Sequence, residues 1–365
     1  MLALSLAAAA LLTTWPRAEL ERLAPLAAMA DLACIESNAD GTMKQVTLLA
    51  WVPAPPAVMR DVIVQSEKYR EFIPNLSKST REPVDPRSGD GRWKSAWRME
   101  LPVSSFEGTN TYWLDGEAIE MRGDDDGARY RYELLPVGEG TLLVQYGYTD
   151  VKHSNAFVRS FVKRQQMMEH GLALSAQLMF VTAMRAEAIR RAGAPKVPAP
   201  STKPPSFAPL LARGQVAIMR NGEVSVLDRI YAPEAKVADA IARVAEYSAF
   251  VPGVDKSYHH DDGFTVEMSL PIVSWSSTWM VKSAPHAIDE AAVDGDLRGA
   301  RIRWDLSTTN ARETLAVYRA RQTLEASSQI LRKLFGFQPS LKEGINVALG
   351  LVWMRAIRGR AEGWR

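Results

Sequence analysis

Residues 69–75, YREFIPN, recur as residues 247–253, YSAFVPG, and this repeated stretch decides how the chain is divided. The two stretches lie 178 residues apart (247 − 69 = 178), and the same offset places Pro55 on Pro233. Solenoid repeats have periods of roughly 20–50 residues, so this spacing is that of a whole domain. The sequence therefore predicts two copies of one domain.

Further matches follow in the same order along the chain. The offset changes only between matched segments, as expected when loops differ in length. The matched pairs are residues 101–104 with 270–273, 127–134 with 299–306, 141–144 with 314–317, and 171–172 with 344–345.

Composition limits the function classes. The 365 residues carry 44 basic and 42 acidic side chains, which gives no reason to expect nucleic acid as a partner. The single Cys34 excludes an intramolecular disulfide framework and a cysteine-based zinc cluster. No P-loop, dinucleotide fingerprint, zinc-protease motif or nucleophile elbow is present.

Residues 1–30 are typical of an export signal. Leu2 to Leu12 is an apolar run of signal-peptide length, and residues 28–30, Ala-Met-Ala, offer a cleavage site before Asp31. No Lys or Arg precedes the run, and charged residues follow it between 17 and 22. We predict a periplasmic or secreted protein. The alternative is a cytoplasmic protein with an amphipathic N-terminal helix.

A Pro-rich segment separates the two copies. Residues 193–213 hold six prolines and predict a stiff linker between a first domain, residues 36–192, and a second domain, residues 214–365. Each copy has the pattern of a strand, short helices, several strands and a long apolar helix. The predicted fold class is α+β, with a bent antiparallel sheet around one long C-terminal helix. A single helix cannot fill a strongly curved sheet, so an apolar cavity is expected between them.

The pattern resembles the START-like (SRPBCC) superfamily, which has the helix-grip fold and includes Bet v 1, polyketide cyclases and coenzyme-Q-binding proteins. The resemblance is carried by residues 53–55, Pro-Ala-Pro, before a short helix, and by the Tyr-x-x-Phe-x-Pro turns at Tyr69 and Tyr247. Family members often have Asp before this Tyr, whereas Lys68 and Glu246 stand here. The resemblance implies binding of a hydrophobic small molecule such as a lipid, sterol or quinone.

Apolar and aromatic residues of the strands and terminal helices are the candidate cavity lining, although each could equally be core packing. They are Trp97, Met99, Tyr112, Leu178 and Phe180 in the first copy, and Met268, Trp304, Val317, Leu349 and Trp353 in the second.

Two alternatives to a ligand carrier stay open. One is a didomain polyketide aromatase/cyclase, whose acid–base candidates are Arg98, Glu100, Tyr112, Glu267 and Arg303. Strand alternation places Arg98 and Glu100 opposite the apolar set, which favours solvent exposure over catalysis. The other alternative is a structural pair that binds nothing.

Residues 259–262, His-His-Asp-Asp, have metal-ligand types, but their pattern favours a solvated turn, and we predict neither a metal nor a cofactor. Basic residues around the terminal helices allow a transient contact with a membrane surface.

Overall fold

The fold is that of a computed structural model, which describes residues 12–84, 91–101, 104–124, 127–150, 166–193, 206–270, 273–321 and 339–364, with the single residues 159 and 332. Three predicted features fall partly outside these ranges: residues 2–11 of the apolar N-terminal run, most of the Pro-rich linker, and the residues before 166 and 339 that the sequence assigns to the two long helices.

The N-terminal half, residues 12–193, follows the predicted order of a strand, short helices, a strand meander and a long helix. Its elements are α1 (Arg17–Ala27), β1 (Asp31–Ser37), β2 (Met43–Val52), α2 (Pro56–Val64), η1 (Ser66–Lys68), α3 (Tyr69–Phe72), β3 (Leu76–Ser79), β4 (Glu82–Pro83), β5 (Trp93–Leu101), β6 (Ser104–Asp115), β7 (Ala118–Gly123), β8 (Ala128–Val137), β9 (Gly140–Thr149) and α5 (Gln166–Ala192).

The C-terminal half, residues 206–364, repeats this order. Its elements are α6 (Ala208–Leu211), β10 (Gln215–Arg220), β11 (Glu223–Ile230), α7 (Glu234–Ala242), η3 (Val244–Glu246), α8 (Tyr247–Phe250), β12 (Val254–His260), β13 (Gly263–Leu270), β14 (Val273–Ala284), β15 (Ala287–Gly295), β16 (Arg301–Asn310), β17 (Glu313–Arg321) and α10 (Pro339–Glu362). The α+β class is confirmed, and a long helix against a curved antiparallel sheet is consistent with the helix grip in each half.

Proline and tyrosine fix the repeated turn that marks each copy. Pro55 and Pro233 stand directly before α2 and α7, where a proline costs no backbone hydrogen bond. The hydroxyl of Tyr69 donates to the carbonyl of Ile63 at 2.5 Å, and the hydroxyl of Tyr247 donates to the carbonyl of Ile241. Each tyrosine therefore ties its short helical turn to the end of the helix before it.

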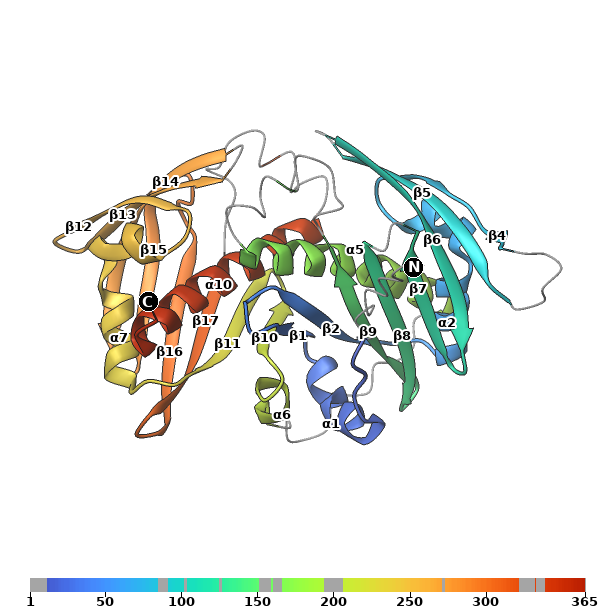
Figure 1. Ribbon diagram of the computed structural model, residues 1–365, viewed down its shortest axis with the longest axis horizontal. Helices are drawn as coiled ribbons and strands as arrows, with labels where there is room; N and C mark the ends of the chain where they lie inside the picture. The colour runs from blue at the N-terminus through green and yellow to red at the C-terminus, as the bar shows by residue number, and fades with distance from the viewer. Residues whose placement is uncertain are drawn as a thin grey trace, which may run out of the picture.

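The two halves share one sheet, which Figure 1 shows running through the whole molecule. Strand β1 pairs with β2 on one side and with β10 of the other half on the other side. At the centre of the β1–β10 ladder Ala33 faces Ala217, Leu32 faces Ile218, and Cys34 faces Val216. Edge strands with free backbone groups tend to pair with other chains. Here β1 and β10 form backbone hydrogen bonds with each other, so neither is left as a free edge at the junction.

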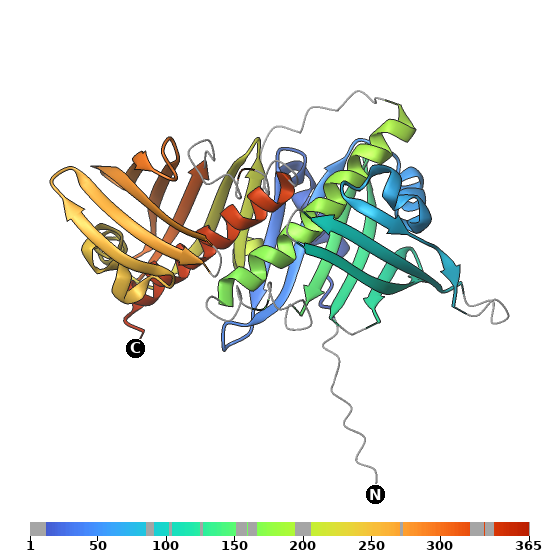
Figure 2. The same ribbon diagram turned by 90° about the horizontal axis from the view of Figure 1, so that it is seen from above.

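Helices α5 and α10 cross above this junction, as Figure 2 shows from a second direction. A Cβ atom added to Gly171 would lie 2.1 Å from the Cβ of Ala348, and one added to Gly344 would lie 1.7 Å from the Oγ of Ser175. The sequence matches place Gly171 on Gly344, so the same close approach occurs twice. Small residues at this crossing let the two helix backbones come together.

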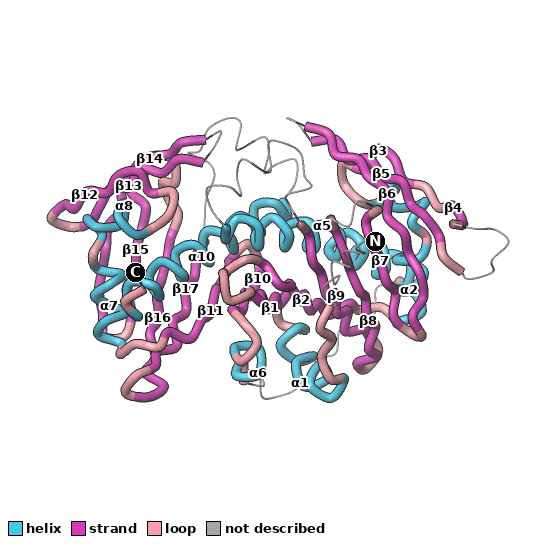
Figure 3. Tube along the Cα trace, viewed as in Figure 1, coloured by secondary structure: helices cyan, strands magenta, loops and turns pink. Residues whose placement is uncertain are grey.

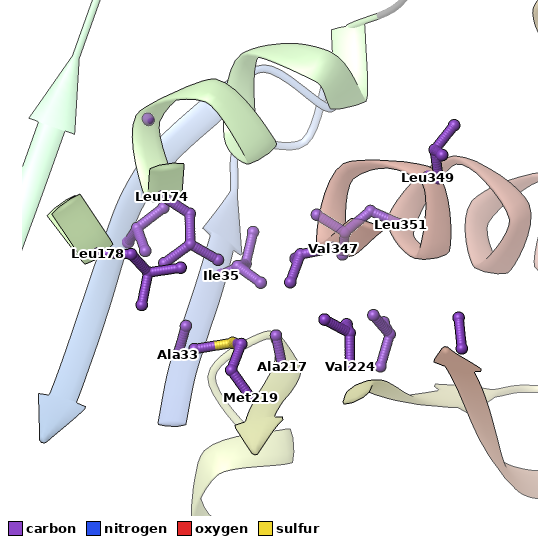
Figure 4. Close-up of a cluster of buried hydrophobic side chains, with 14 of the residues drawn as sticks. Ala33, Ile35, Leu174, Leu178, Ala217, Met219, Val224, Val347, Leu349 and Leu351 are labelled. Atoms are coloured by element: carbon purple, nitrogen blue, oxygen red, sulfur yellow. The ribbon is translucent and has the colours of Figure 1, made fainter. Parts of the chain in front are cut away.

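Apolar side chains fill both faces of the sheet. The inner core lies between the sheet and the two long helices, and Figure 4 shows how Ala33, Ala217, Leu178 and Val347 meet near the junction. A smaller outer core lies on the opposite face, which α1 and α6 cover (Figure 3). Helix α5 is long and apolar enough, from Glu169 to Ala192, to pass for a membrane span, but most of it is buried between the sheet and α10.

Residues predicted to form a signal peptide are part of this outer core. Helix α1 buries Leu20, Leu23 and Leu26 against the sheet, and the backbone N–H of Trp15 donates to the hydroxyl of Tyr146 at 3.0 Å. The carboxylate of Glu19 pairs with Arg213 of the other half at 2.7 Å. Export and the alternative of a retained N-terminal helix both remain predictions.

The helix crossing predicts the result of adding one methyl group. We expect Gly171→Ala and Gly344→Ala to lower the free energy of unfolding by about 1–3 kcal/mol through overpacking, although alanine favours a helix by about 1 kcal/mol. Gly359→Ala is the control, because its Cβ would meet only the exposed ring of Trp364 at 3.1 Å. Urea unfolding measures all three variants, and an increase in stability for the first two would contradict the crossing.

Removing residues 1–30 tests the role of α1. The deletion removes Leu20, Leu23 and Leu26, and the burial of each such side chain contributes roughly 1.5–3 kcal/mol to the free energy of unfolding. We therefore expect a clearly lower urea midpoint than for the full chain. Removing only residues 1–11 keeps α1 and is the control, and removing residues 1–30 should lower the midpoint further than this control does. A form starting at Asp31 that is as stable as the full chain would instead support cleavage at Ala30.

Candidate ligand pocket

An interior pocket lies in the C-terminal half, between the inner face of β13–β17 and helix α10. It has an accessible volume of about 30 Å³, enough for about two water molecules. A larger ligand must therefore displace side chains. The lining residues are Phe264, Val266, Met268, Trp275, Trp279, Glu290, Leu297, Ile302, Tyr318, Leu349 and Trp353.

Strand alternation explains why these side chains point inward. Phe264, Val266 and Met268 stand two residues apart on β13 and all are buried. On the neighbouring strand β14, Trp275 faces Met268 and Trp279 faces Phe264 in the ladder. The rings of Phe264 and Trp279 stack at 10° with 6.4 Å between their centroids. One wall of the pocket is therefore largely aromatic.

Glu290 is an acid in this apolar wall. It lies on β15 between Val281 of β14 and Ile302 of β16, with only 6% of its surface exposed. Desolvation raises the pKa of its carboxyl to about 8, and the indole N–H of Trp304, which donates to it, opposes this rise. At neutral pH most of this carboxyl is therefore protonated and able to donate a hydrogen bond.

Two further polar atoms of the pocket have no partner among the described residues. They are the Nε1 atoms of Trp275 and Trp279, both shielded from solvent. A buried donor without an acceptor costs roughly 1–3 kcal/mol. The pocket thus holds hydrogen-bonding capacity that the described part of the chain does not use.

The equivalent interior of the N-terminal half is filled differently. The offset of 169 that relates Leu101 to Leu270 places Met121 on Glu290, and Met121 is buried between Tyr112 and Tyr130 in the ladders. Trp93 stacks on Tyr112 with ring centroids 5.3 Å apart. On α5, both amide atoms of the fully buried Gln177 lack a partner in the described residues. The two interiors therefore share a scaffold and differ in chemistry.

The predicted lining residues of the N-terminal half belong to its inner core. Met99, Tyr112 and Leu178 are buried, while Trp97 and Phe180 are partly buried and pack against the same core. Phe180 meets the ring of Tyr69 edge-on at 6.4 Å. Burial raises the pKa of Tyr112 to about 12, so its hydroxyl stays neutral.

In the C-terminal half, Met268, Leu349 and Trp353 lie on the pocket wall. Trp304 is buried beside it, edge-on to Tyr318 at 5.0 Å and bonded to Glu290. The placement of Val317 is a correction. Thr314, Ala316, Tyr318 and Ala320 of β17 face the inner core, so alternation turns Val317 to the outer core.

The acid–base candidates named from the sequence are mostly surface ion pairs. Arg98 pairs with Glu100 at 2.6 Å, Glu267 with Lys256 at 3.0 Å, and Arg303 with Asp289 and Asp305. Exposed pairs of this kind contribute little and have no access to the interior. Glu290 was missed, although it shares with the buried Ile288 the alternating inward face of β15. That alternation was the available signal.

The polar residues near the terminal helices are also engaged or exposed. Arg185 binds Asp31 through two bonds of 2.6 and 2.9 Å, Arg191 pairs with Glu187, and Arg360 with Glu246. Within residues 259–262, His259 and His260 end strand β12, and Asp261 and Asp262 form the tight turn before β13, all of them exposed. Within the described ranges, no three His, Cys, Asp or Glu side chains gather as a metal site would require.

A larger hollow of about 380 Å³ lies on the surface between the halves. Ser37, Asp228, Arg355, Arg358 and Trp364 are among its lining residues. Arg358 pairs there with Asp228 at 3.4 Å and with Glu362 at 3.0 Å. The groove is polar and open, so the smaller interior pocket is the better candidate for an apolar ligand.

Scans of protein families and of curated proteins find no match to this chain. Among solved structures, it is similar to the di-domain aromatase/cyclase StfQ of the steffimycin pathway, with 12% identity and a TM-score of 0.30, over 87% of this chain and 98% of that one. It is also similar to a START superfamily protein from Mycobacterium smegmatis, with 15% identity and a TM-score of 0.31, over 39% and 99%. The Zhui aromatase/cyclase from Streptomyces gives 18% identity and a TM-score of 0.32, over 38% and 93%.

Two of these three solved structures are thus aromatase/cyclases and one is a START superfamily protein. The fold of this chain is described by its own topology, in which each half has a sheet around one long helix.

The buried acid predicts how stability changes with pH. Because the folded protein holds the Glu290 proton more tightly than the unfolded chain, its contribution is fully present below about pH 4.5 and is lost as the pH rises through about 8. We expect the free energy of unfolding of Glu290→Gln, relative to wild type, to rise by at most about 1.4 kcal/mol per pH unit across this window. Urea unfolding at several pH values measures this difference, and a constant difference would contradict a buried neutral acid.

Proposed function

We propose that this protein binds a hydrophobic small molecule, such as a lipid, sterol or quinone, in the interior of its C-terminal half. The observation that supports this best is the aromatic pocket against α10, which holds a buried acid and two indole donors that have no partner in the described part of the chain. Apolar pockets with a few inward polar groups are the usual form of small-molecule sites.

The composition of the wall supports a ligand role over simple packing. A core optimised for stability avoids buried donors without acceptors, because each one costs free energy. Four buried indole N–H groups lack an acceptor among the described residues, and two of them, those of Trp275 and Trp279, line the same pocket as Glu290. A ligand that supplies oxygen acceptors would recover that cost on binding.

The pocket must enlarge to take such a ligand, and its wall has side chains suited to this change. Met268 is unbranched and adopts many conformations, and Leu349 and Trp353 lie on α10 at the pocket edge. Trp353 is only partly buried, although its ring meets Tyr247 edge-on at 4.8 Å. Rotation of these three side chains widens the pocket without moving a strand.

A didomain aromatase/cyclase is the second candidate, and Glu290 is the observation that favours it. An acid whose pKa is near 8 can both give and accept a proton at neutral pH, as acid–base catalysis requires. Turnover of a poly-β-ketone, lost in Glu290→Gln, separates this candidate from a carrier.

The binding proposal is tested by filling the pocket. We expect wild type to bind the neutral fluorophore N-phenyl-1-naphthylamine with increased emission, and to release bound lipid into an organic extract. Leu349→Trp fills the pocket and should weaken fluorophore binding at least tenfold. Fluorescence titration gives the affinities, and mass spectrometry identifies the extracted molecules.

Ala176→Trp is the matched control, because the offset of 173 places Ala176 of α5 on Leu349 of α10. It adds the same ring to the other half and should leave the main binding event unchanged. Equal binding in Leu349→Trp and wild type would exclude the C-terminal pocket as the site. Circular dichroism confirms that both variants are folded.

A further inference from the structure

We propose that Glu290 acts as a neutral hydrogen-bond donor that selects hydrophobic ligands carrying an acceptor oxygen, such as the carbonyl of a ketone, quinone or ester. This inference rests on the proposed function and deepens it, because it names the ligand chemistry that the C-terminal pocket prefers over hydrocarbons and over amines.

The hydrogen-bond inventory of the pocket is unbalanced toward donors. The indole N–H of Trp304 already donates to the Glu290 carboxyl. The indole N–H groups of Trp275 and Trp279 have no acceptor among the described residues. A protonated Glu290 adds an O–H donor to these two. A ligand that fits this inventory brings acceptors, and a carbonyl oxygen has two lone pairs to offer.

The surroundings of Glu290 favour its neutral form, because the described residues place no positive charge near its carboxyl. The titratable groups that it acts on are Tyr247 of α8 and Tyr318 of β17, and burial raises the pKa of both hydroxyls, so they stay neutral. Within the described ranges no basic side chain acts on the Glu290 carboxyl. An ionised Glu290 would therefore be an uncompensated buried charge, which is far more costly than a neutral acid.

Comparison of the two halves argues that the acid is not needed for the fold. Met121 occupies the equivalent place on β7 and is equally buried. Methionine packs well in irregular cores and brings no desolvation cost. The same scaffold therefore forms with an apolar side chain at this position, and Glu290 adds recognition at the expense of packing.

The pocket selects between ligand classes because they differ in how many of its hydrogen-bond donors they leave without an acceptor. A ketone accepts from Glu290 or from an indole, whereas a hydrocarbon of the same shape leaves all three donors unsatisfied. One such buried hydrogen bond corresponds to roughly a five- to hundredfold change in affinity. A cationic amine requires an ionised Glu290 and brings additional donors to a pocket already rich in them.

The test uses three probes of nearly identical shape: 2-acetylnaphthalene, 2-ethylnaphthalene and 1-(2-naphthyl)ethylamine. Each displaces N-phenyl-1-naphthylamine from wild type at pH 6. We expect the ketone to bind roughly ten- to hundredfold more tightly than the hydrocarbon, and the amine to bind most weakly. Glu290→Met, which copies the residue of the other half and keeps the two indole donors, should reduce the preference for ketone over hydrocarbon at least fivefold.

A pH series provides a measurement that needs no variant. Between pH 6 and pH 9.5 the affinity for the ketone should fall toward that for the hydrocarbon, which should itself stay constant. Equal affinities for ketone and hydrocarbon in wild type, or tightest binding of the amine, would overturn the inference while leaving hydrophobic binding intact. If the fluorophore binds but none of the three probes displaces it, this inference fails; if the fluorophore does not bind either, the proposed function fails together with it.

Discussion

The close approach of α5 and α10 above the β1–β10 ladder is the constraint on which the rest of the molecule depends. Gly171 and Gly344 allow the helix backbones to meet, and Ala33 opposite Ala217 joins the two sheets directly beneath. Both contacts are needed, because the helices cover the inner face of a sheet that continues from one half into the other. The interior of each half is then enclosed by its own part of the shared sheet and by its own long helix.

Much of this fold follows from the sequence, because its signals are local. Prolines before α2 and α7, strand alternation and the apolar runs of the long helices predict the α+β class and the order of elements. The pairing of β1 with β10 is not predictable in this way, since the two strands are 184 residues apart (217 − 33 = 184) and neither one reveals its partner. The sequence leaves the role of residues 17–27, in export or in the fold, open for the same reason. An apolar helix face looks alike whether it meets a translocon or a sheet.

The candidate site is likewise predictable from the sequence only in part. Alternation identifies the inward residues of β13, whereas Val317 was misplaced because the face of β17 depends on pairing with β11 and β16. Glu290 escaped notice because an acid in a strand is normally assumed to face solvent. Its burial is a property of the curved sheet around it, where Trp304 supplies a hydrogen bond and no described basic group supplies a charge.

The Ala33–Ala217 pair has a further meaning. Ala33 pairs with Leu48 and Ala217 with Val226, 178 residues further on (226 − 48 = 178), so equivalent residues of the two halves face each other there. The helix contacts of Gly171 with Ala348 and of Gly344 with Ser175 are likewise reciprocal, as they would be about the twofold axis of a symmetric dimer. A true homodimer must carry every substitution twice. A single chain with this geometry is free of that rule, so one half can acquire a costly acid while the other keeps methionine and maintains the stability of both.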